Sequence, residues 1–298
     1  MNHFTKHIAG LTVAAFATFG LASQAKAVEV QEVVSDGGIR AWLIEDHLNP
    51  LMTMDIAFTG AGAATDADGK LGLSNMVSGL IDEGAGEMDS QTFRGEMENR
   101  SISLSFDAGR DDFAGSLVTL TRERDTAIDL LRLALSEPRF DDEAIERIRA
   151  QIVSGLKSAE NDPGDIASRT FFKSIFGDHP YARPVSGNFD TVASLNANDF
   201  RGFVRHAFAK DNLIIGVAGD ITADELGPLL DEAFGSLPDH ADLPAIADVT
   251  PTFGAIDVVK QDIPQSQAIW GQKGIKRTDP DFYAAYVMNY ILGGGGFS

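Results

Sequence analysis

The side chains best suited to catalysis are scarce in this sequence. It contains no cysteine and six histidines, two of which lie within the first 27 residues. The other four are His47, His179, His206 and His240, and no two of them are four residues apart, so no helix presents paired imidazoles to a metal ion. The lack of cysteine excludes thiolate zinc sites and thiol nucleophiles. The chain is therefore not expected to hold a catalytic metal by itself.

Two short motifs suggest ligand loops but lack essential parts. Residues 60–62 (GAG) precede a predicted helix, yet the third glycine of a dinucleotide loop and a GK[ST] ending are missing. Residues 66–69 (DADG) match part of a calcium loop, but the remaining ligands do not follow. No serine lies in a G-x-S-x-G motif. We interpret both loops as structural.

The most informative segment is residues 72–84, GLSNMVSGLIDEG. It resembles the active-site helix of the pitrilysin/insulinase family of zinc peptidases, the inverted zincins, whose pattern is H-x-x-E-H. In that pattern two histidines on one helix face bind zinc, and the glutamate takes a proton from the zinc-bound water. A further glutamate from a later helix completes the site.

Other segments resemble the same family in the same order, so the resemblance covers nearly all of residues 28–298. They are the turn before the second ligand helix at 135–141, a later loop at 178–187, the closing strand at 213–220, and a glycine-rich loop early in the second domain at 291–298.

The residues at the family's functional positions have changed. Asn75 and Gly79 stand where the two histidines belong, Ser78 replaces the glutamate base, and Gly155 stands at the later glutamate. An asparagine amide is a poor zinc ligand, serine has no useful basicity near neutral pH, and glycine has no side chain. The resemblance therefore implies a family member without catalytic or metal-binding residues of its own.

Two details of this region leave alternatives open. Gly79 and Gly155 lie inside predicted helices, where glycine costs about 1 kcal/mol relative to alanine. They reflect either drift after catalysis was lost or the close approach of a partner or peptide. Asp82 and Glu83, one turn further on, are interpreted as solvated surface at a helix end.

The elements around these motifs predict an α+β fold: a mixed, mostly antiparallel sheet with helices packed on one face. Alternating patterns predict strands, and apolar residues at helical spacing predict helices. The strands are expected at 28–34, 40–44, 51–58, 101–108, 113–120 and 213–217, and the helices at 71–82, 90–98, 124–135, 141–159, 166–176, 197–208 and 223–234.

The pattern restarts near the C-terminal end. Residues 28–240 are predicted to form the first peptidase-family domain and 241–251 a linker. Residues 252–298 are predicted to begin a second, homologous domain, with strands at 255–259 and 267–271 and a helix at 282–292. Because two strands and one helix cannot close a core, the sequence is expected to be a fragment of a longer protein.

Residues 1–27 have the features of a cleavable signal peptide. Lys6 provides the positive start, residues 8–22 are apolar, and residues 25–27 (AKA) form a cleavage site after Ala27. A periplasmic protein without stable membrane insertion is expected. Removing the two lysines of this segment leaves 22 basic and 44 acidic residues, a net charge of −22 that disfavours nucleic acid as a partner.

The resemblance implies a non-catalytic, substrate-binding or structural subunit that pairs with an H-x-x-E-H subunit carrying the zinc, with peptides as ligands. Residues Gly293, Gly294, Gly295 and Gly296 are candidates for substrate binding. The alternatives are a scaffold or assembly protein of a membrane-associated complex and an active metallopeptidase with unusual ligands.

Overall fold

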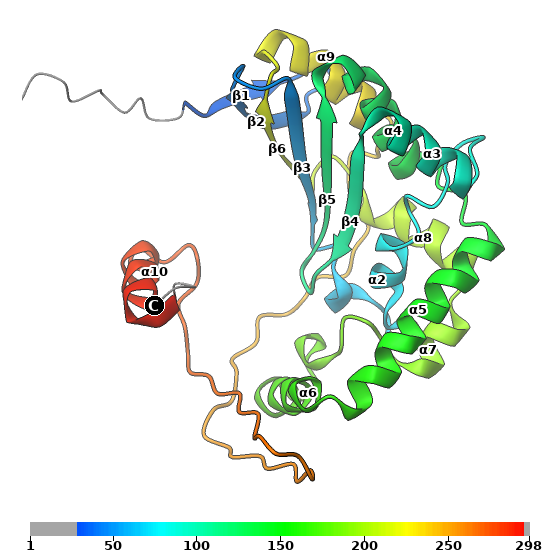
Figure 1. Ribbon diagram of the computed structural model, residues 1–298. Coiled ribbons are helices and arrows are strands. Elements are labelled where there is room, and N and C mark those ends of the chain that lie inside the picture. Colours follow the sequence, from blue (N-terminus) through cyan, green and yellow to red (C-terminus); the bar gives the residue numbers. More distant parts are fainter. Residues whose placement is uncertain (1–28, 295–298) are drawn as a thin grey trace, which may run out of the picture.

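The computed structural model describes residues 29–294 and is built on one six-stranded sheet (Figure 1). The strand order is β1-β2-β6-β3-β5-β4. Every neighbouring pair is antiparallel except β2 and β6, which run parallel, so the prediction of a mixed, mostly antiparallel sheet is confirmed. The strands are β1 (Gln31–Val34), β2 (Arg40–Glu45), β3 (Leu51–Thr59), β4 (Ser103–Ala108), β5 (Asp112–Leu120) and β6 (Leu213–Gly219).

The helices that bury the sheet lie on one of its faces, to its right in Figure 1. Strand β3 shows why: Met52, Met54, Ile56 and Phe58 alternate with more exposed neighbours, so one face is apolar and must be covered. The helices are α2 (Leu73–Ser78), α3 (Ser90–Arg100), α4 (Arg124–Ser136), α5 (Asp142–Asn161), α6 (Pro163–Phe176), α7 (Phe189–Ser194), α8 (Ala197–Ala207), α9 (Ala223–Phe234) and α10 (Phe282–Asn289).

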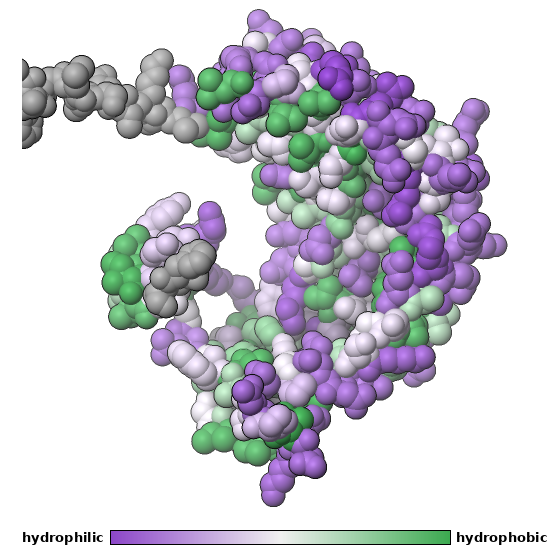
Figure 2. Space-filling view, in the orientation of Figure 1, coloured by the Kyte–Doolittle hydropathy of each residue, from purple (hydrophilic) through white to green (hydrophobic). Residues whose placement is uncertain are grey.

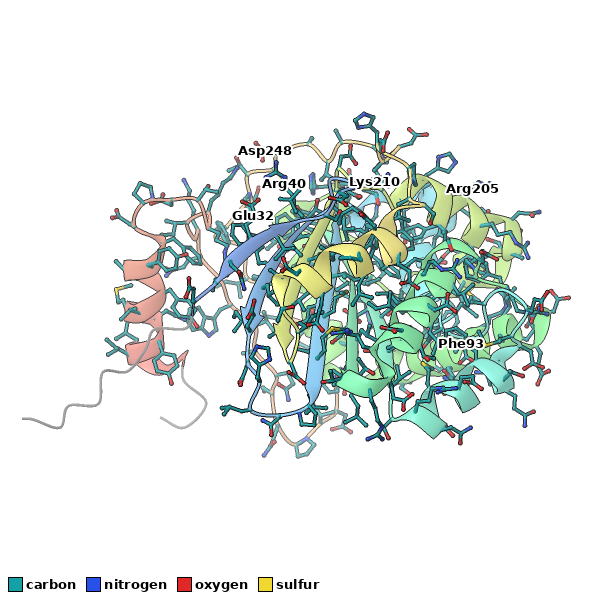
Figure 3. The ribbon with its side chains drawn as sticks, turned by 90° about the horizontal axis from the view of Figure 1, so that it is seen from above. Glu32, Arg40, Phe93, Arg205, Lys210 and Asp248 are labelled. Carbon is teal, nitrogen blue, oxygen red and sulfur yellow. The ribbon has the colours of Figure 1, made fainter. Side chains whose placement is uncertain are left out.

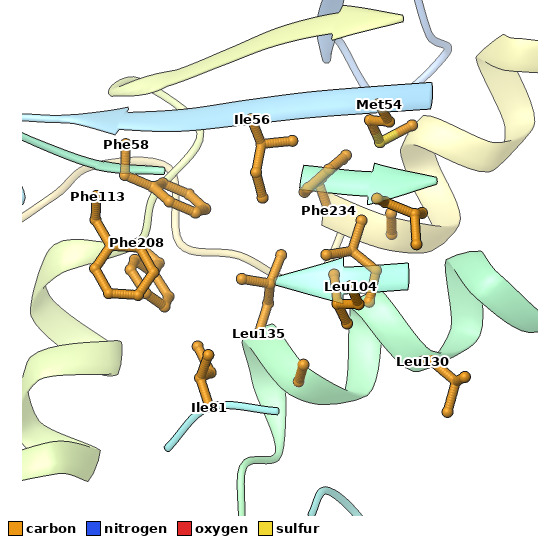
Figure 4. Close-up of a cluster of buried hydrophobic side chains, with 14 of the residues drawn as sticks. Met54, Ile56, Phe58, Ile81, Leu104, Phe113, Leu130, Leu135, Phe208 and Phe234 are labelled. Carbon is orange, nitrogen blue, oxygen red and sulfur yellow. The ribbon is translucent and has the colours of Figure 1, made fainter. Parts of the chain in front are cut away.

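Aromatic rings fill the core between the sheet and α8 (Figure 4). The ring of Phe58 stacks on that of Phe208 with centroids 4.3 Å apart, and Phe113 packs against Phe208 at 5.0 Å. All three side chains are fully buried. Such rings remove large apolar areas from water and gain a further preference from their offset geometry.

Two helices differ from the prediction. Helix α2 ends at Ser78, because Gly79 is its C-cap, and the apolar Leu80 and Ile81 are buried in turns instead. Helix α7 was not predicted, although Asn188 and Thr191 form a capping box at its start. Polar capping residues were present in the sequence, but the helix is too short to show an apolar period.

The strands predicted at 255–259 and 267–271 are wrong for the structure, where both segments are extended without ladder pairing. A strand needs a neighbour for its N–H and C=O groups, and no strand among residues 29–294 lies beside these segments. The helix predicted at 282–292 is present as α10, followed by a π-helical turn at Tyr290–Gly294.

Helix α10 is rich in aromatic and apolar residues and lies apart from the sheet (Figure 1), and Figure 2 shows hydrophobic side chains on its outer side. Tyr283, Tyr286 and Val287 are all more than half exposed. None of the helices between residues 29 and 294 is long and apolar enough to cross a bilayer. The predicted signal peptide lies outside the described residues.

Candidate functional site

The loop before α2 is organised by a buried carboxylate. Asp66 accepts hydrogen bonds from the backbone N–H groups of Gly72 at 2.9 Å and Ser74 at 3.2 Å, and so satisfies donors at the helix start. Burial raises the pKa of Asp66 to about 6, although these hydrogen bonds act in the opposite direction. Residues 66–69 therefore serve as a helix-capping loop in the structure, and their first aspartate points to α2.

The three positions of the altered H-x-x-E-H pattern lie on α2 and its C-cap. Ser78 is buried, whereas Asn75 and Gly79 are partly exposed. The Ser78 hydroxyl donates to the carbonyl oxygen of Asn75 at 2.9 Å, within the same helix. This hydroxyl is thus engaged with its own backbone and is not aimed at a reactive centre.

Helix α5 packs against Gly79 through an aliphatic side chain. A Cβ atom added at Gly79 would lie 3.2 Å from Cγ2 of Ile148, which is tighter than ordinary packing. The imidazole of a histidine at this position would therefore meet Ile148. Gly155 lies two turns further along α5, about 10 Å along the helix axis, and has open space beside it.

These residues do not fit a zinc ion. They supply an amide, a hydroxyl bound to backbone and two positions without side chains, next to the aliphatic Ile148. Within residues 29–294 no group of three or more His, Cys, Asp or Glu side chains is placed to hold a metal. No reaction step through a metal is therefore derived for this chain.

The interpretation of Glu83 as solvated surface is wrong. Its side chain is 1% exposed and accepts two hydrogen bonds of 2.8 Å from the guanidinium of Arg147 on α5. Arg94 of α3 lies 2.7 Å from the same carboxylate, and the Ser90 hydroxyl donates to it at 2.5 Å. This cluster, called here the Glu83 cluster, ties the turn after α2 to α3 and α5.

The charges of the Glu83 cluster stabilise its carboxylate. Burial by itself raises the pKa of Glu83, but hydrogen bonds from Arg147 and Ser90 and the charges of Arg94 and Arg147 outweigh it, so this pKa is lowered. The neighbouring Asp82 lacks such partners, and burial raises its pKa to about 6. Sequence reasoning missed this cluster, because Arg147 is 64 residues from Glu83 and 57 residues from Ser90.

The loop at 178–187 connects the linker to the sheet. Nε2 of His179 lies 2.9 Å from the carbonyl oxygen of Ala247, and the hydroxyl of Tyr181 donates to Asp111 at 2.6 Å. His206 pairs with Asp242 at 3.1 Å. These contacts give both histidines structural roles.

Only part of the glycine-rich segment falls within the described residues. Gly293 has a φ of 132° and Gly294 ends the π-helical turn, both on the exposed end of the chain. Gly295 and Gly296 lie outside the described residues. Substrate binding by these glycines therefore stays a prediction.

Comparison with known proteins shows what this chain is similar to. Residues 194–298 match the model described as the peptidase M16 inactive domain. A non-peptidase homologue from Helicobacter pylori is 27% identical over 278 residues, which cover 91% of this chain and 63% of that protein. The chain thus spans less than two thirds of this relative.

Solved structures share the fold. The M16 inactive domain from Pseudomonas fluorescens superposes with a TM-score of 0.76 at 23% identity, covering 91% of this chain and 66% of the other. Pitrilysin superposes with a TM-score of 0.66 at 17% identity, covering 77% of this chain and 25% of pitrilysin. With the ordered motifs and the α2–α5 arrangement, these matches show that the chain has the fold of M16 proteins and is similar to inactive members of that family.

Proposed function

We propose that this chain is a non-catalytic subunit of a heterodimeric zinc peptidase in the periplasm. Its partner is a subunit of the same family with an intact H-x-x-E-H helix, and the zinc belongs to that partner. The present chain contributes structure and part of the peptide-binding surface. The relative from Helicobacter pylori is named a non-peptidase homologue, which supports this reading.

One observation supports the proposal most strongly. The helix that holds the metal in the family is retained and packed, while its ligand positions carry Asn75, Ser78 and Gly79, with Ile148 against Gly79. A protein that keeps the framework without the ligands is better suited to supporting a partner than to cleaving peptides. The Glu83 cluster ties the turn after α2 to α5 through ion pairs, and this tie does not require a metal.

A reconstitution experiment tests the proposal. The full-length protein without its signal peptide is purified and assayed against a mixture of fluorogenic peptides, alone and with the H-x-x-E-H protein from the same organism. We expect no zinc-dependent cleavage by this chain alone and at least tenfold stimulation of the partner. The matched variant Asn75→Ala should stimulate equally, since this position does no chemistry.

Two results would contradict the proposal. Zinc-dependent cleavage by the isolated chain that is abolished by Asn75→Ala would restore the alternative of a peptidase with unusual ligands. A partner whose cleavage rate is unaffected by this chain would leave the scaffold alternative in its place.

A further inference from the structure

The face of the sheet that no helix buries carries an aromatic and an acidic side chain on either side of a glycine. We propose that Trp42 of β2 and Asp55 of β3, separated by Gly216 of β6, form a seat for the cationic side chain of a bound peptide. This inference takes from the proposed function only that the ligand is a peptide.

The strand register brings these residues into one row. Trp42 is paired with Gly216 in the β2–β6 ladder, and Asp55 is paired with Gly216 in the β3–β6 ladder. Residues paired across neighbouring strands point to the same face of a sheet. Because strands lie about 4.8 Å apart, the backbones of Trp42 and Asp55 are about 10 Å apart, which leaves the width of one side chain between them.

The sheet surface at Gly216, between Trp42 and Asp55, is open. A Cβ atom added at Gly216 meets nothing within 4 Å, and this glycine has no positive φ that would demand it. Neither packing nor backbone geometry therefore explains a glycine in the middle of a strand, where it is unfavourable. Close approach of a ligand does explain it. Trp42 is 53% exposed, so its indole is available to that ligand.

The charges of the strand residues favour a cation as the ligand. The six strands contain one basic residue, Arg40, and its guanidinium is already bound to Glu32 at 2.8 Å (Figure 3). Asp55 and Asp107 are exposed on the strands and make no ion pair or side-chain hydrogen bond with residues 29–294. The uncompensated charges of this face are therefore acidic, and they lie among exposed apolar side chains such as Ile214 and Val118, within a protein whose formal net charge is −20.

The side chains of Trp42 and Asp55 are suited to bind the side chain of arginine or lysine. A guanidinium or ammonium group within about 6 Å of an indole ring is attracted to the ring face, and a carboxylate opposite gives a charge-assisted hydrogen bond. Next to the seat, Ala57, Ser116 and Ala218 have small side chains, which let an extended peptide backbone lie close to the sheet.

Fluorescence of Trp42 gives a direct test without partner or cleavage. Residues 1–298 contain two tryptophans, so Trp270→Phe in this 298-residue chain leaves Trp42 as the only reporter within it. An acetylated and amidated hexapeptide with one central arginine is titrated against this protein, and the same peptide with citrulline serves as the neutral control. We expect saturable quenching by the arginine peptide and at least tenfold weaker binding of the citrulline peptide.

Substitutions separate a defined seat from diffuse attraction. Asp55→Asn is expected to weaken binding at least fivefold, and Gly216→Val, which fills the open sheet surface without changing charge, at least tenfold. Asp107→Asn removes an equal charge from the edge strand of the sheet and should change the affinity less than twofold. Circular dichroism of each variant checks that the strand still forms.

Several outcomes would overturn the inference. Equal weakening by Asp55→Asn and Asp107→Asn would mean that the acidic surface acts as a whole. Unchanged binding in Gly216→Val, or equal binding of the citrulline peptide, would exclude the seat. Lack of saturation at millimolar peptide would do the same. Since the assay contains no partner, failure to pair with an H-x-x-E-H subunit would not affect any of these results.

Discussion

Replacing Arg147 with methionine would leave the buried carboxylate of Glu83 without its bidentate partner. The methionine keeps much of the aliphatic packing of the arginine stem, so the change mainly removes two hydrogen bonds of 2.8 Å. Removing one partner of a fully buried ion pair costs about 3–5 kcal/mol. A smaller loss is expected here, because the Arg147 side chain is 39% exposed and Arg94 remains 2.7 Å from the carboxylate.

We therefore expect Arg147→Met to lower the free energy of unfolding by about 2 kcal/mol, or about 4–8 °C in Tm for a domain of this size. Glu83→Gln should cost about 1 kcal/mol, since both arginines then reach water. The double variant Glu83→Gln/Arg147→Met should be more stable than Arg147→Met alone, because it contains no buried carboxylate that has lost its bidentate partner.

Urea unfolding followed by circular dichroism measures all three variants. Arg132→Met is the matched control: Arg132 pairs with Asp129 at 2.6 Å, and the Asp129 side chain is 48% exposed, so the change leaves no carboxylate buried without its partner. If Arg147→Met cost no more than this control, or if the double variant lost the sum of the two single losses, the Glu83 cluster would not link α2, α3 and α5 as described.

Three further predictions concern Asp66, the packing of Ile148 against Gly79, and the N-cap of α7. Asp66 has a pKa of about 6 against an ordinary value of 3.8, so its folded form takes up protons first and its contribution to stability rises as the pH falls through 6. Relative to Asp66→Asn, the wild type should gain about 2 kcal/mol between pH 7.5 and 4.5 in urea unfolding, and a loss of stability over this range would refute the assignment. Gly79→His should cost about 1–3 kcal/mol by overpacking, and adding Ile148→Ala should recover part of it if that contact is the cause. Asn188→Ala should cost about 1 kcal/mol through loss of the α7 cap, and Asn188→Ser should retain most of it.

Much of this fold was predictable from sequence, because it depends on local periodicity. Strand β3 alternates clearly and α5 carries Ile145 and Ile148 one turn apart, so both were found close to their true ends. The segments 255–259 and 267–271 have the composition of strands as well. Pairing decides whether such a segment becomes a strand, and composition does not contain that information.

The altered pattern at Asn75, Ser78 and Gly79 was recognisable from sequence, because these positions lie within five residues of one another. Burial of Glu83 was not, since it depends on Arg147, 64 residues away on another helix. A charged residue after a helix is usually solvated, and only the packing of α3 and α5 around the turn reverses that expectation. The contact of Ile148 with Gly79 was missed for the same reason.

A native pull-down tests the central claim most directly. The tagged full-length chain is isolated from the periplasm of its own organism, and the proteins that accompany it are identified by mass spectrometry. The account predicts a near-stoichiometric partner that carries H-x-x-E-H. Recovery of the chain alone, or with unrelated subunits of a membrane complex, would contradict it.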